Sequence, residues 1–149
     1  MKYFEYQENA IKKLLSSSNE LLDLDGFQSL IFKSPTGSGK TIMIAEYLKN
    51  LVLNNTEKDF SFIWAAPRKL HLQSMYKLDQ HFKNSRVINC STFEDLVDNS
   101  ISKNEILFIN WESINKEKNI FFRENEQDFY LEKIANNTSE SNRSIILII

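Results

Sequence analysis

The sequence predicts an α/β protein with a three-layer parallel sheet, covered by helices on both faces. Its apolar runs are continuous rather than alternating, which is typical of strands buried on both sides. Stretches with helical periodicity separate these runs, as expected when the chain crosses from one parallel strand to the next. The 149 residues are 42% hydrophobic and 26% charged, a composition that suits one folded core and not a disordered or fibrous chain.

The first third of the chain predicts a helix, a strand, a glycine loop and a second helix. Apolar residues recur at helical spacing over residues 6–15, and three serines at 16–18 end that run. Residues 30–32 are a compact apolar run and are predicted as a strand. The loop at 34–41 follows, and apolar residues from 44 to 52 then mark one face of a helix.

The middle of the chain repeats the alternation of strand and helix. Residues 60–66 form a second strand candidate, which Pro67 closes, and residues 72–82 have near-helical spacing. Residues 86–90 are a short apolar run that is predicted as a third strand. The segment 91–95, Ser-Thr-Phe-Glu-Asp, has the form of a capping box and therefore predicts the start of a helix.

The last third of the chain ends on an apolar run. Residues 106–109 predict a fourth strand, apolar positions at 129–135 suggest a helix, and the polar residues 136–142 suggest a loop. Residues 144–149 predict a fifth strand. A buried parallel strand normally continues into a loop at its carboxyl end. We therefore expect these residues to be a piece of a longer protein.

Charge and composition limit the function. Eighteen basic and twenty acidic side chains give a formal charge of -2, so nucleic-acid binding would have to be local. The chain has neither the pattern of a signal peptide nor an apolar stretch near the ~20 residues of a membrane span, which predicts a cytoplasmic protein. The single cysteine, Cys90, is predicted to be a small buried hydrophobe, because His71 and His81 give no zinc-ligand spacing.

Residues 34–41 meet the requirements of a Walker A phosphate loop between a strand and a helix. Gly37 and Gly39 let the backbone turn so that its N–H groups point into one concavity, and the helix N-terminus adds a partial positive charge. Lys40 would reach the β- and γ-phosphates of ATP, and the Thr41 hydroxyl would ligate Mg²⁺. Ser34 stands where the strict pattern has glycine, and a small residue still allows the turn. The predicted nucleotide-binding residues of this loop are Ser34, Pro35, Thr36, Gly37, Ser38, Gly39, Lys40 and Thr41.

The helix that precedes the loop carries two further candidates. A primary amide such as that of Gln7 pairs bidentately with the N7/N6 edge of adenine, whereas guanine presents two acceptors there. Its neighbour Tyr6 is either a ring that stacks on the adenine or an ordinary core residue. A glutamine early in a helix is also common without any ligand, so the assignment of Gln7 keeps that alternative.

Several segments resemble the conserved motifs of superfamily 2 helicases. Residues 4–11 resemble the Q motif, residues 34–41 resemble motif I, and residues 66–73 resemble motif Ia with a spacing that is one residue shorter. Residues 109–114 resemble a segment where relatives often have Thr-Tyr-Glu-Ser-Leu, and residues 145–149 resemble the strand that leads into the Asp-Glu-x-His box. The similarity spans essentially the whole chain and is closest to the DEAD/DEAH-box family that includes the helicase (Res) subunit of type III restriction enzymes.

This resemblance implies that residues 1–149 are the N-terminal part of the first RecA-like motor domain of an ATP-dependent DNA helicase or translocase. It implies catalytic roles for Lys40 and Thr41 with ATP and Mg²⁺, and contacts from Arg68 and Lys69 to the DNA phosphate backbone. The implied partners are DNA, the rest of the helicase chain and a modification (methyltransferase) subunit. The Walker B acids and the second RecA-like domain are absent from these residues, so they should hydrolyse ATP negligibly alone.

Other interpretations stay open. The chain could be a different P-loop enzyme such as a nucleotide-dependent kinase, or a non-catalytic module that binds ATP or DNA. Arg68 and Lys69 could also be a solvated helix start. Ser91 and Thr92 could touch DNA phosphate, although we favour a helix cap for both. Trp64 and Trp111 lie in or beside apolar runs, which favours core packing over base stacking for both.

Overall fold

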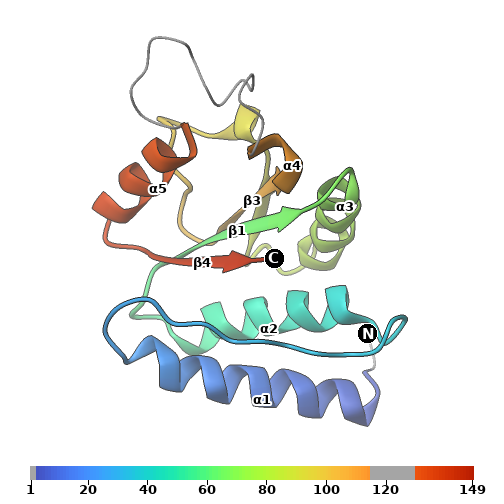
Figure 1. Ribbon diagram of the computed structural model, residues 1–149. Helices are drawn as coiled ribbons and strands as arrows, with labels where there is room; N and C mark the ends of the chain where they lie inside the picture. The colour runs from blue at the N-terminus through green and yellow to red at the C-terminus, as the bar shows by residue number, and fades with distance from the viewer. Residues whose placement is uncertain (1–2, 115–129) are drawn as a thin grey trace. The chain divides into compact units, whose positions relative to one another are not determined.

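The structure is a computed structural model that describes residues 3–114 and 130–149 (Figure 1). The chain forms two compact units, Met1–Asn54 and Asn55–Ile149. The first unit contains helices α1 (Glu5–Leu22) and α2 (Lys40–Asn54). The second contains a four-stranded sheet with its own helices. Within the described residues, no helix has the length and apolar character needed to cross a membrane.

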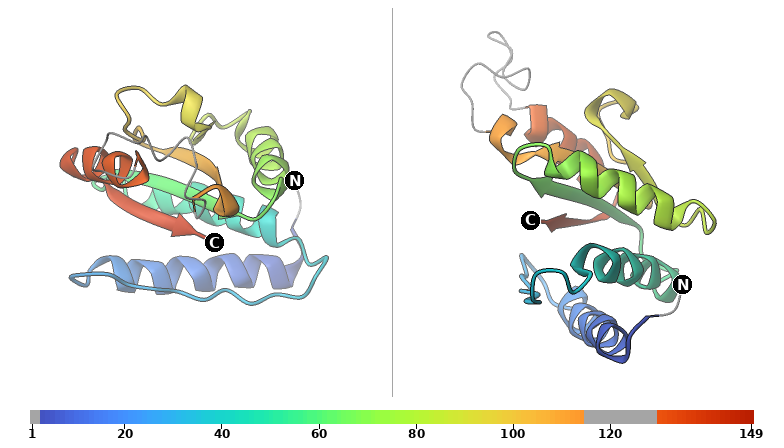
Figure 2. Two further views of the ribbon diagram at one scale, coloured as in Figure 1. Left: turned by 45° about the horizontal axis from the view of Figure 1, so that its top comes forward. Right: turned by 90° about the vertical axis from the view of Figure 1, so that its right-hand side faces the viewer.

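In the first unit, α1 and α2 pack side by side (Figures 1 and 2). The buried faces carry apolar residues such as Leu14 on α1 and Leu48 on α2. The prediction that serines 16–18 end the first helix is wrong, because α1 continues to Leu22. The Ser18 hydroxyl lies buried 2.7 Å from the hydroxyl of Tyr47 on α2, so the serine is a hydrogen-bonded part of the helix interface.

The predicted strand at 30–32 does not form. Residues 27–35 have no regular secondary structure and run back alongside α1 to the start of α2 (Figure 2). Ile31 is 79% exposed. A strand needs a neighbour for its ladder hydrogen bonds, and none of the strands in the described ranges pairs with this segment. Apolar composition alone therefore did not produce a strand here.

In the second unit the sheet has the order β2-β3-β1-β4, and every pairing is parallel. Its strands are β1 (Phe60–Ala66), β2 (Asn89–Ser91), β3 (Glu105–Asn110) and β4 (Ser144–Ile148). Register places Phe62 of the central strand β1 opposite Ile106 on one side and Ile146 on the other. The structure thus confirms the α/β class and the parallel sheet.

The core of the second unit explains why β1 is apolar at successive positions. Alternate residues of a strand point to opposite faces, and both sets are buried from Phe60 to Ala65. On one face, Ile63 belongs to a cluster with Ile134 of α5 (Tyr130–Glu140). Helix α3 (Leu70–Phe82) contacts β1, β2 and β3 and buries Leu78 and Phe82. Trp64 is buried and stacks on Phe108, which confirms it as a core residue.

Two predicted boundaries in the second unit are wrong for local reasons. The strand predicted at 86–90 begins only at Asn89, because Arg86 has φ +51° and its N–H donates to the Phe82 carbonyl oxygen at the end of α3. The loop predicted at 136–142 is helical as far as Glu140. There the buried Thr138 hydroxyl donates to the Ile134 carbonyl oxygen and accepts the N–H of Ile101. Of the helix predicted at 129–135, residue 129 lies outside the described residues.

The capping-box segment forms a cap, followed by a single turn. Asp95 accepts hydrogen bonds from the Thr92 N–H at 2.7 Å and from the Thr92 hydroxyl at 2.8 Å. These bonds hold the pKa of the Asp95 carboxyl below its usual value. The 3-10 helix η1 (Phe93–Asp95) then ends, because Leu96 has an extended backbone. The prediction that Ser91 caps this turn is wrong, because Ser91 is buried in β2 and its hydroxyl donates to the Ile106 carbonyl oxygen.

Candidate nucleotide-binding site

The loop that precedes α2 has the backbone of an anion cradle. Gly37 and Gly39 have φ values of +80° and +86°, a conformation that glycine adopts without the steric cost of a Cβ. The loop runs directly into the N-terminus of α2, a helix of 15 residues, at Lys40. The exposed N–H groups and partial positive charge of such a helix start favour a phosphate group. The residues present therefore fit a polyphosphate.

The side chain of Lys40 is folded over this loop. Its Nζ donates to the carbonyl oxygens of Ser34 at 2.9 Å and Pro35 at 3.0 Å. Neutral carbonyl oxygens do not balance the charge of an ammonium group. A bound anion would therefore form stronger hydrogen bonds with Lys40 and displace these carbonyl contacts. Thr41 follows as the second residue of α2, and its hydroxyl is the kind of oxygen donor that Mg²⁺ accepts.

The side chain of Ser34 makes a contact across the loop. Its hydroxyl lies 2.5 Å from the Ser38 hydroxyl, within hydrogen-bond distance. The Ser38 N–H also donates to the Pro35 carbonyl oxygen. The serine that replaces the glycine of the strict pattern is therefore compatible with the turn and adds a contact across it.

Tyr6 and Gln7, at the start of α1, both reach the loop. The Tyr6 hydroxyl donates to the Ser38 carbonyl oxygen at 3.0 Å, and Gln7 Nε2 donates to the same oxygen at 3.0 Å. Tyr6 is 51% exposed, so it is not the ordinary core residue of the alternative interpretation. The structure thus brings together the two α1 candidates and the loop, which lie about thirty residues apart in the sequence.

The amide of Gln7 is held in one orientation. Its Oε1 accepts the Phe4 N–H at 3.0 Å, while its Nε2 donates to Ser38, so exchanging the two atoms would lose both bonds. A primary amide has two lone pairs on oxygen and two N–H groups. One of each remains, which is the pair of groups that the N7/N6 edge of adenine requires. The hydrogen bonds of Gln7 therefore leave one N–H and one lone pair of its amide unused, in a residue that is buried in α1.

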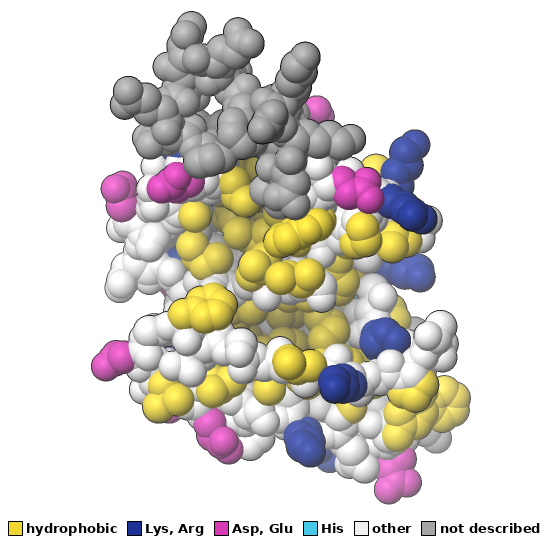
Figure 3. All heavy atoms as spheres, in the orientation of Figure 1, with side chains coloured by type: hydrophobic (Ala, Val, Ile, Leu, Met, Phe, Trp, Pro, Cys, Tyr) yellow, Lys and Arg dark blue, Asp and Glu magenta, His cyan; other side chains and the backbone are white. Residues whose placement is uncertain are grey.

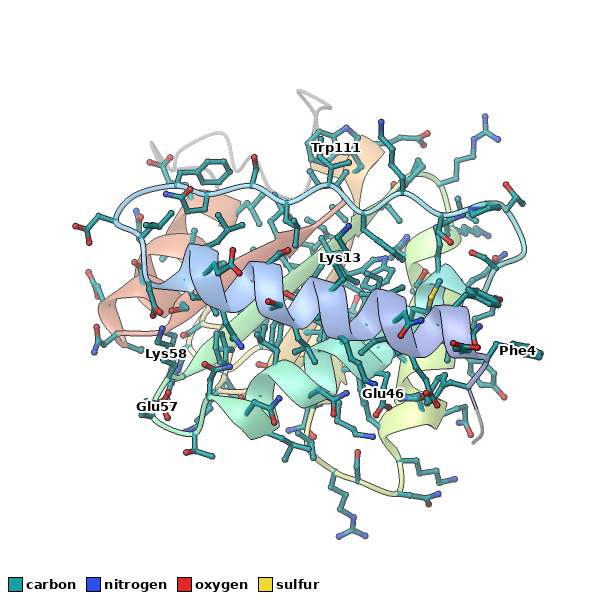
Figure 4. All side chains as sticks on the ribbon, turned by 90° about the horizontal axis from the view of Figure 1, so that it is seen from below. Phe4, Lys13, Glu46, Glu57, Lys58 and Trp111 are labelled. Atoms are coloured by element: carbon teal, nitrogen blue, oxygen red, sulfur yellow. The ribbon has the colours of Figure 1, made fainter. Side chains whose placement is uncertain are left out.

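Phe4 is a candidate that sequence reasoning missed. Its ring stacks on that of Tyr6, with centroids 5.9 Å apart and planes within 8° of parallel. The side chain is 68% exposed and projects outward at the beginning of α1 (Figure 4). It lies just before the helix, where the backbone is still extended, and no local feature of the sequence marks it as part of the site.

The basic pair Arg68 and Lys69 lies in the second unit, between β1 and α3. Both side chains are exposed, and lysine and arginine side chains gather beside α3 on the right of Figure 3. Arg68 has φ +55°, and its carbonyl oxygen lies 3.0 Å from His71 Nδ1. The strained backbone turns the chain at the carboxyl end of β1, which is the edge where parallel sheets bind ligands.

The prediction that Trp111 packs in the core is wrong, because its side chain is 42% exposed. It is the first residue of the short helix α4 (Trp111–Ile114), which begins immediately after β3 ends at Asn110. Asn110, the residue before it, accepts the Glu112 N–H through its Oδ1. Asparagine is a favoured N-cap residue, so it suits the start of a helix.

Cys90 is half-buried in β2. Burial, together with the carboxylate of Asp79, raises the pKa of its thiol to about 12. A thiol that stays protonated at neutral pH is a poor nucleophile and a poor metal ligand. Its environment therefore fits a structural role.

A family model described as "Type III restriction enzyme, res subunit" matches residues 1–149. Neither the curated proteins nor the solved structures contain a significant match. The all-parallel sheet with flanking helices is an α/β, RecA-like arrangement that agrees with this family.

Proposed function

Because the chain belongs to the type III restriction enzyme res subunit family, we propose that it is the ATP-binding part of an ATP-dependent DNA helicase or translocase. The family is helicase-like, which gives the general enzymatic class. The observation that carries the proposal is the phosphate loop itself. Two glycines with positive φ, a lysine folded over the loop and a long helix behind it occur together.

In this proposal the phosphates of ATP lie in the loop. Backbone N–H groups of residues 37–41 donate to the phosphate oxygens, and for this the Ser38 N–H gives up its bond to the Pro35 carbonyl oxygen. Lys40 exchanges its two carbonyl partners for the β- and γ-phosphates. The Thr41 hydroxyl holds Mg²⁺, whose chemistry is to neutralise charge on the phosphate oxygens as the terminal phosphoryl group is transferred. The remaining loop residues, Ser34, Pro35 and Thr36, shape the turn.

The adenine subsite of this proposal lies at the start of α1. Gln7 uses its remaining lone pair and N–H for the N6/N7 edge of the base. The stacked rings of Phe4 and Tyr6 present exposed aromatic surface beside it. This arrangement favours ATP over GTP, because guanine offers two acceptors to an amide whose orientation is already fixed.

Arg68 and Lys69 are the proposed contacts to DNA phosphates. The net charge of -2 provides no general attraction, so such local cations would have to supply it. By family resemblance, the wider setting is a DEAD/DEAH-box motor of a restriction-modification system in the cytoplasm. Its partners there would be the rest of the helicase chain and a methyltransferase subunit.

Calorimetric titration of Mg-ATP into the purified chain and its Lys40→Ala variant tests the phosphate-loop assignment. Charged hydrogen bonds contribute about 1.5–3 kcal/mol, so the variant should bind roughly 10- to 150-fold more weakly. Lys13→Ala is the matched control, because it removes an exposed lysine of the same unit without touching the loop. Equal affinities for the wild type and Lys40→Ala would overturn the assignment.

Two further titrations test the base and DNA contacts. Gln7→Ala should reduce the preference for ATP over GTP, and unchanged selectivity would count against the adenine subsite. An Arg68→Ala/Lys69→Ala variant should bind fluorescent duplex or single-stranded DNA more weakly, with a shallower dependence on salt of roughly 0.7–0.9 in log-log slope per lost phosphate contact. An unchanged slope would remove this pair from the proposed DNA surface.

A further inference from the structure

One carbonyl oxygen of the phosphate loop, that of Ser38, accepts two side-chain hydrogen bonds from α1. Tyr6 and Gln7 donate to it at the same distance of 3.0 Å. Two donors on one backbone oxygen hold that peptide more firmly than either alone. The contact joins the base side of the site to its phosphate side, within a single compact unit.

The geometry of the peptide bond gives this contact a consequence for phosphate binding. The Ser38–Gly39 peptide is trans, and in a trans peptide the C=O and the N–H point in opposite directions. Holding the Ser38 carbonyl toward α1 therefore directs the Gly39 N–H away from α1. Gly39 is one of the glycines whose N–H groups line a loop of this type.

This peptide needs an anchor because it adjoins a glycine. Glycine populates positive and negative φ about equally, so the plane of a peptide beside it rotates at little steric cost. A Cβ added to Gly39 would lie 2.8 Å from Gln7 Nε2, which shows how closely the backbone is drawn against α1. Without the side-chain bonds, nothing in the glycine itself would select the orientation of its N–H.

We propose that Tyr6 is a positioning residue of the phosphate loop. Its hydroxyl, together with the Gln7 amide, sets the Ser38–Gly39 peptide so that the Gly39 N–H faces the phosphates. This inference rests on the proposed function and adds to it a role for Tyr6 that is independent of the base. It follows that the hydroxyl contributes to binding of a ligand that has phosphates and no base.

Tyr6→Phe is the informative variant, because it removes the hydroxyl and keeps the ring that stacks on Phe4. The ring is half-exposed, so the change opens no cavity. The two probes are Mg-ATP and inorganic triphosphate, titrated calorimetrically. Tyr6→Phe should weaken both by a similar factor of about two- to tenfold, the effect of one neutral hydrogen bond.

Two matched variants separate the roles. Phe4→Ala should weaken ATP more than triphosphate, since the proposed function puts its ring beside the base, and it keeps the Tyr6 hydroxyl. Tyr76→Phe removes the hydroxyl of an exposed tyrosine on α3, in the other unit, and should change neither ligand. The thermal midpoint of Tyr6→Phe should stay close to that of the wild type, which separates positioning of the peptide from general destabilisation.

The outcomes distinguish this inference from the proposed function. If Tyr6→Phe weakens ATP only, or weakens neither ligand, while the wild type binds both, the positioning role is wrong and the phosphate loop stands. If the wild type binds no better than Lys40→Ala, the proposed function fails, and the positioning role fails with it.

Discussion

Replacing Ser18 with alanine should lower the free energy of unfolding by about 1–3 kcal/mol. Its hydroxyl and that of Tyr47 are 2.7 Å apart and join α1 to α2, and both residues are buried. Removing one partner leaves the other hydroxyl buried without a hydrogen bond, and that desolvation cost sets the magnitude. Tyr47→Phe likewise leaves the Ser18 hydroxyl buried without a hydrogen bond, and should lower the free energy of unfolding by a similar amount.

The double variant Ser18→Ala/Tyr47→Phe removes both hydroxyls and leaves no buried hydroxyl without a partner. It should therefore cost less than the two single changes added together, with a coupling of about 0.5–3 kcal/mol. For a chain of this size, each 1 kcal/mol corresponds to about 2–4 °C in Tm. The single variants should accordingly unfold several degrees lower than the wild type.

Urea unfolding followed by circular dichroism measures these energies at equilibrium. Ser16→Ala, an exposed serine on the same helix, is the control and should change stability by less than about 0.5 kcal/mol. A Ser18→Ala variant as stable as the wild type, or single effects that simply add in the double variant, would show that the two hydroxyls do not stabilise the helix interface together.

Three further predictions concern single residues. Gly39→Ala places a Cβ at φ +86° and 2.8 Å from Gln7 Nε2, so it should cost about 1–2 kcal/mol of stability and weaken Mg-ATP in titration; full retention of both would contradict the loop geometry. Cys90 has a thiol pKa raised to about 12 by burial and by Asp79, so at pH 8 a thiol reagent should modify it far more slowly in the folded protein than in urea; equal rates would contradict this. Burial, with help from Glu46, raises the pKa of Tyr3 from 10.0 to about 12. The unfolded chain therefore loses this proton at a lower pH than the folded chain, so stability should fall as the pH rises from about 10 toward 12. Tyr3→Phe should flatten this part of a plot of urea midpoint against pH. An unaltered slope would show that Tyr3 does not contribute.

Local composition was enough to predict the strands at the centre of the sheet. β1 and β3 are apolar at successive positions because both their faces are buried, and this pattern is visible in the sequence. Residues 30–32 have the same composition and remain unpaired. The difference lies in whether a neighbouring strand is present, which depends on residues far away in the chain and leaves no local signal.

Side-chain partners across the fold were equally invisible in the sequence. Ser18 belongs to a run of serines, which is typical of a helix end. Only its hydrogen bond with the hydroxyl of Tyr47, 29 residues later, makes it part of the helix interface. Trp111 follows an apolar run closely enough to suggest the core, yet the strand ends one residue before it.

The candidate site was predictable where chemistry fixes the residue type. The glycines and Lys40 of the loop follow from what a polyphosphate needs, and Gln7 from what adenine presents. The bond from the Tyr6 hydroxyl to the Ser38 carbonyl oxygen was not predictable, because it depends on how α1 meets the loop. Phe4 was missed for the same reason, since only its stacking on Tyr6 brings it to the site.

In the proposed site, the backbone N–H groups of residues 37–41 bind the phosphates of ATP. Two-dimensional ¹H–¹⁵N NMR of the labelled chain observes this binding, because each backbone N–H reports on its own hydrogen bond. On addition of Mg-ATP, the largest shift changes should fall on the amides of Gly37, Ser38, Gly39, Lys40 and Thr41. If saturating ATP leaves these five amides unmoved, or moves chiefly amides elsewhere in the chain, the phosphates do not bind in this loop.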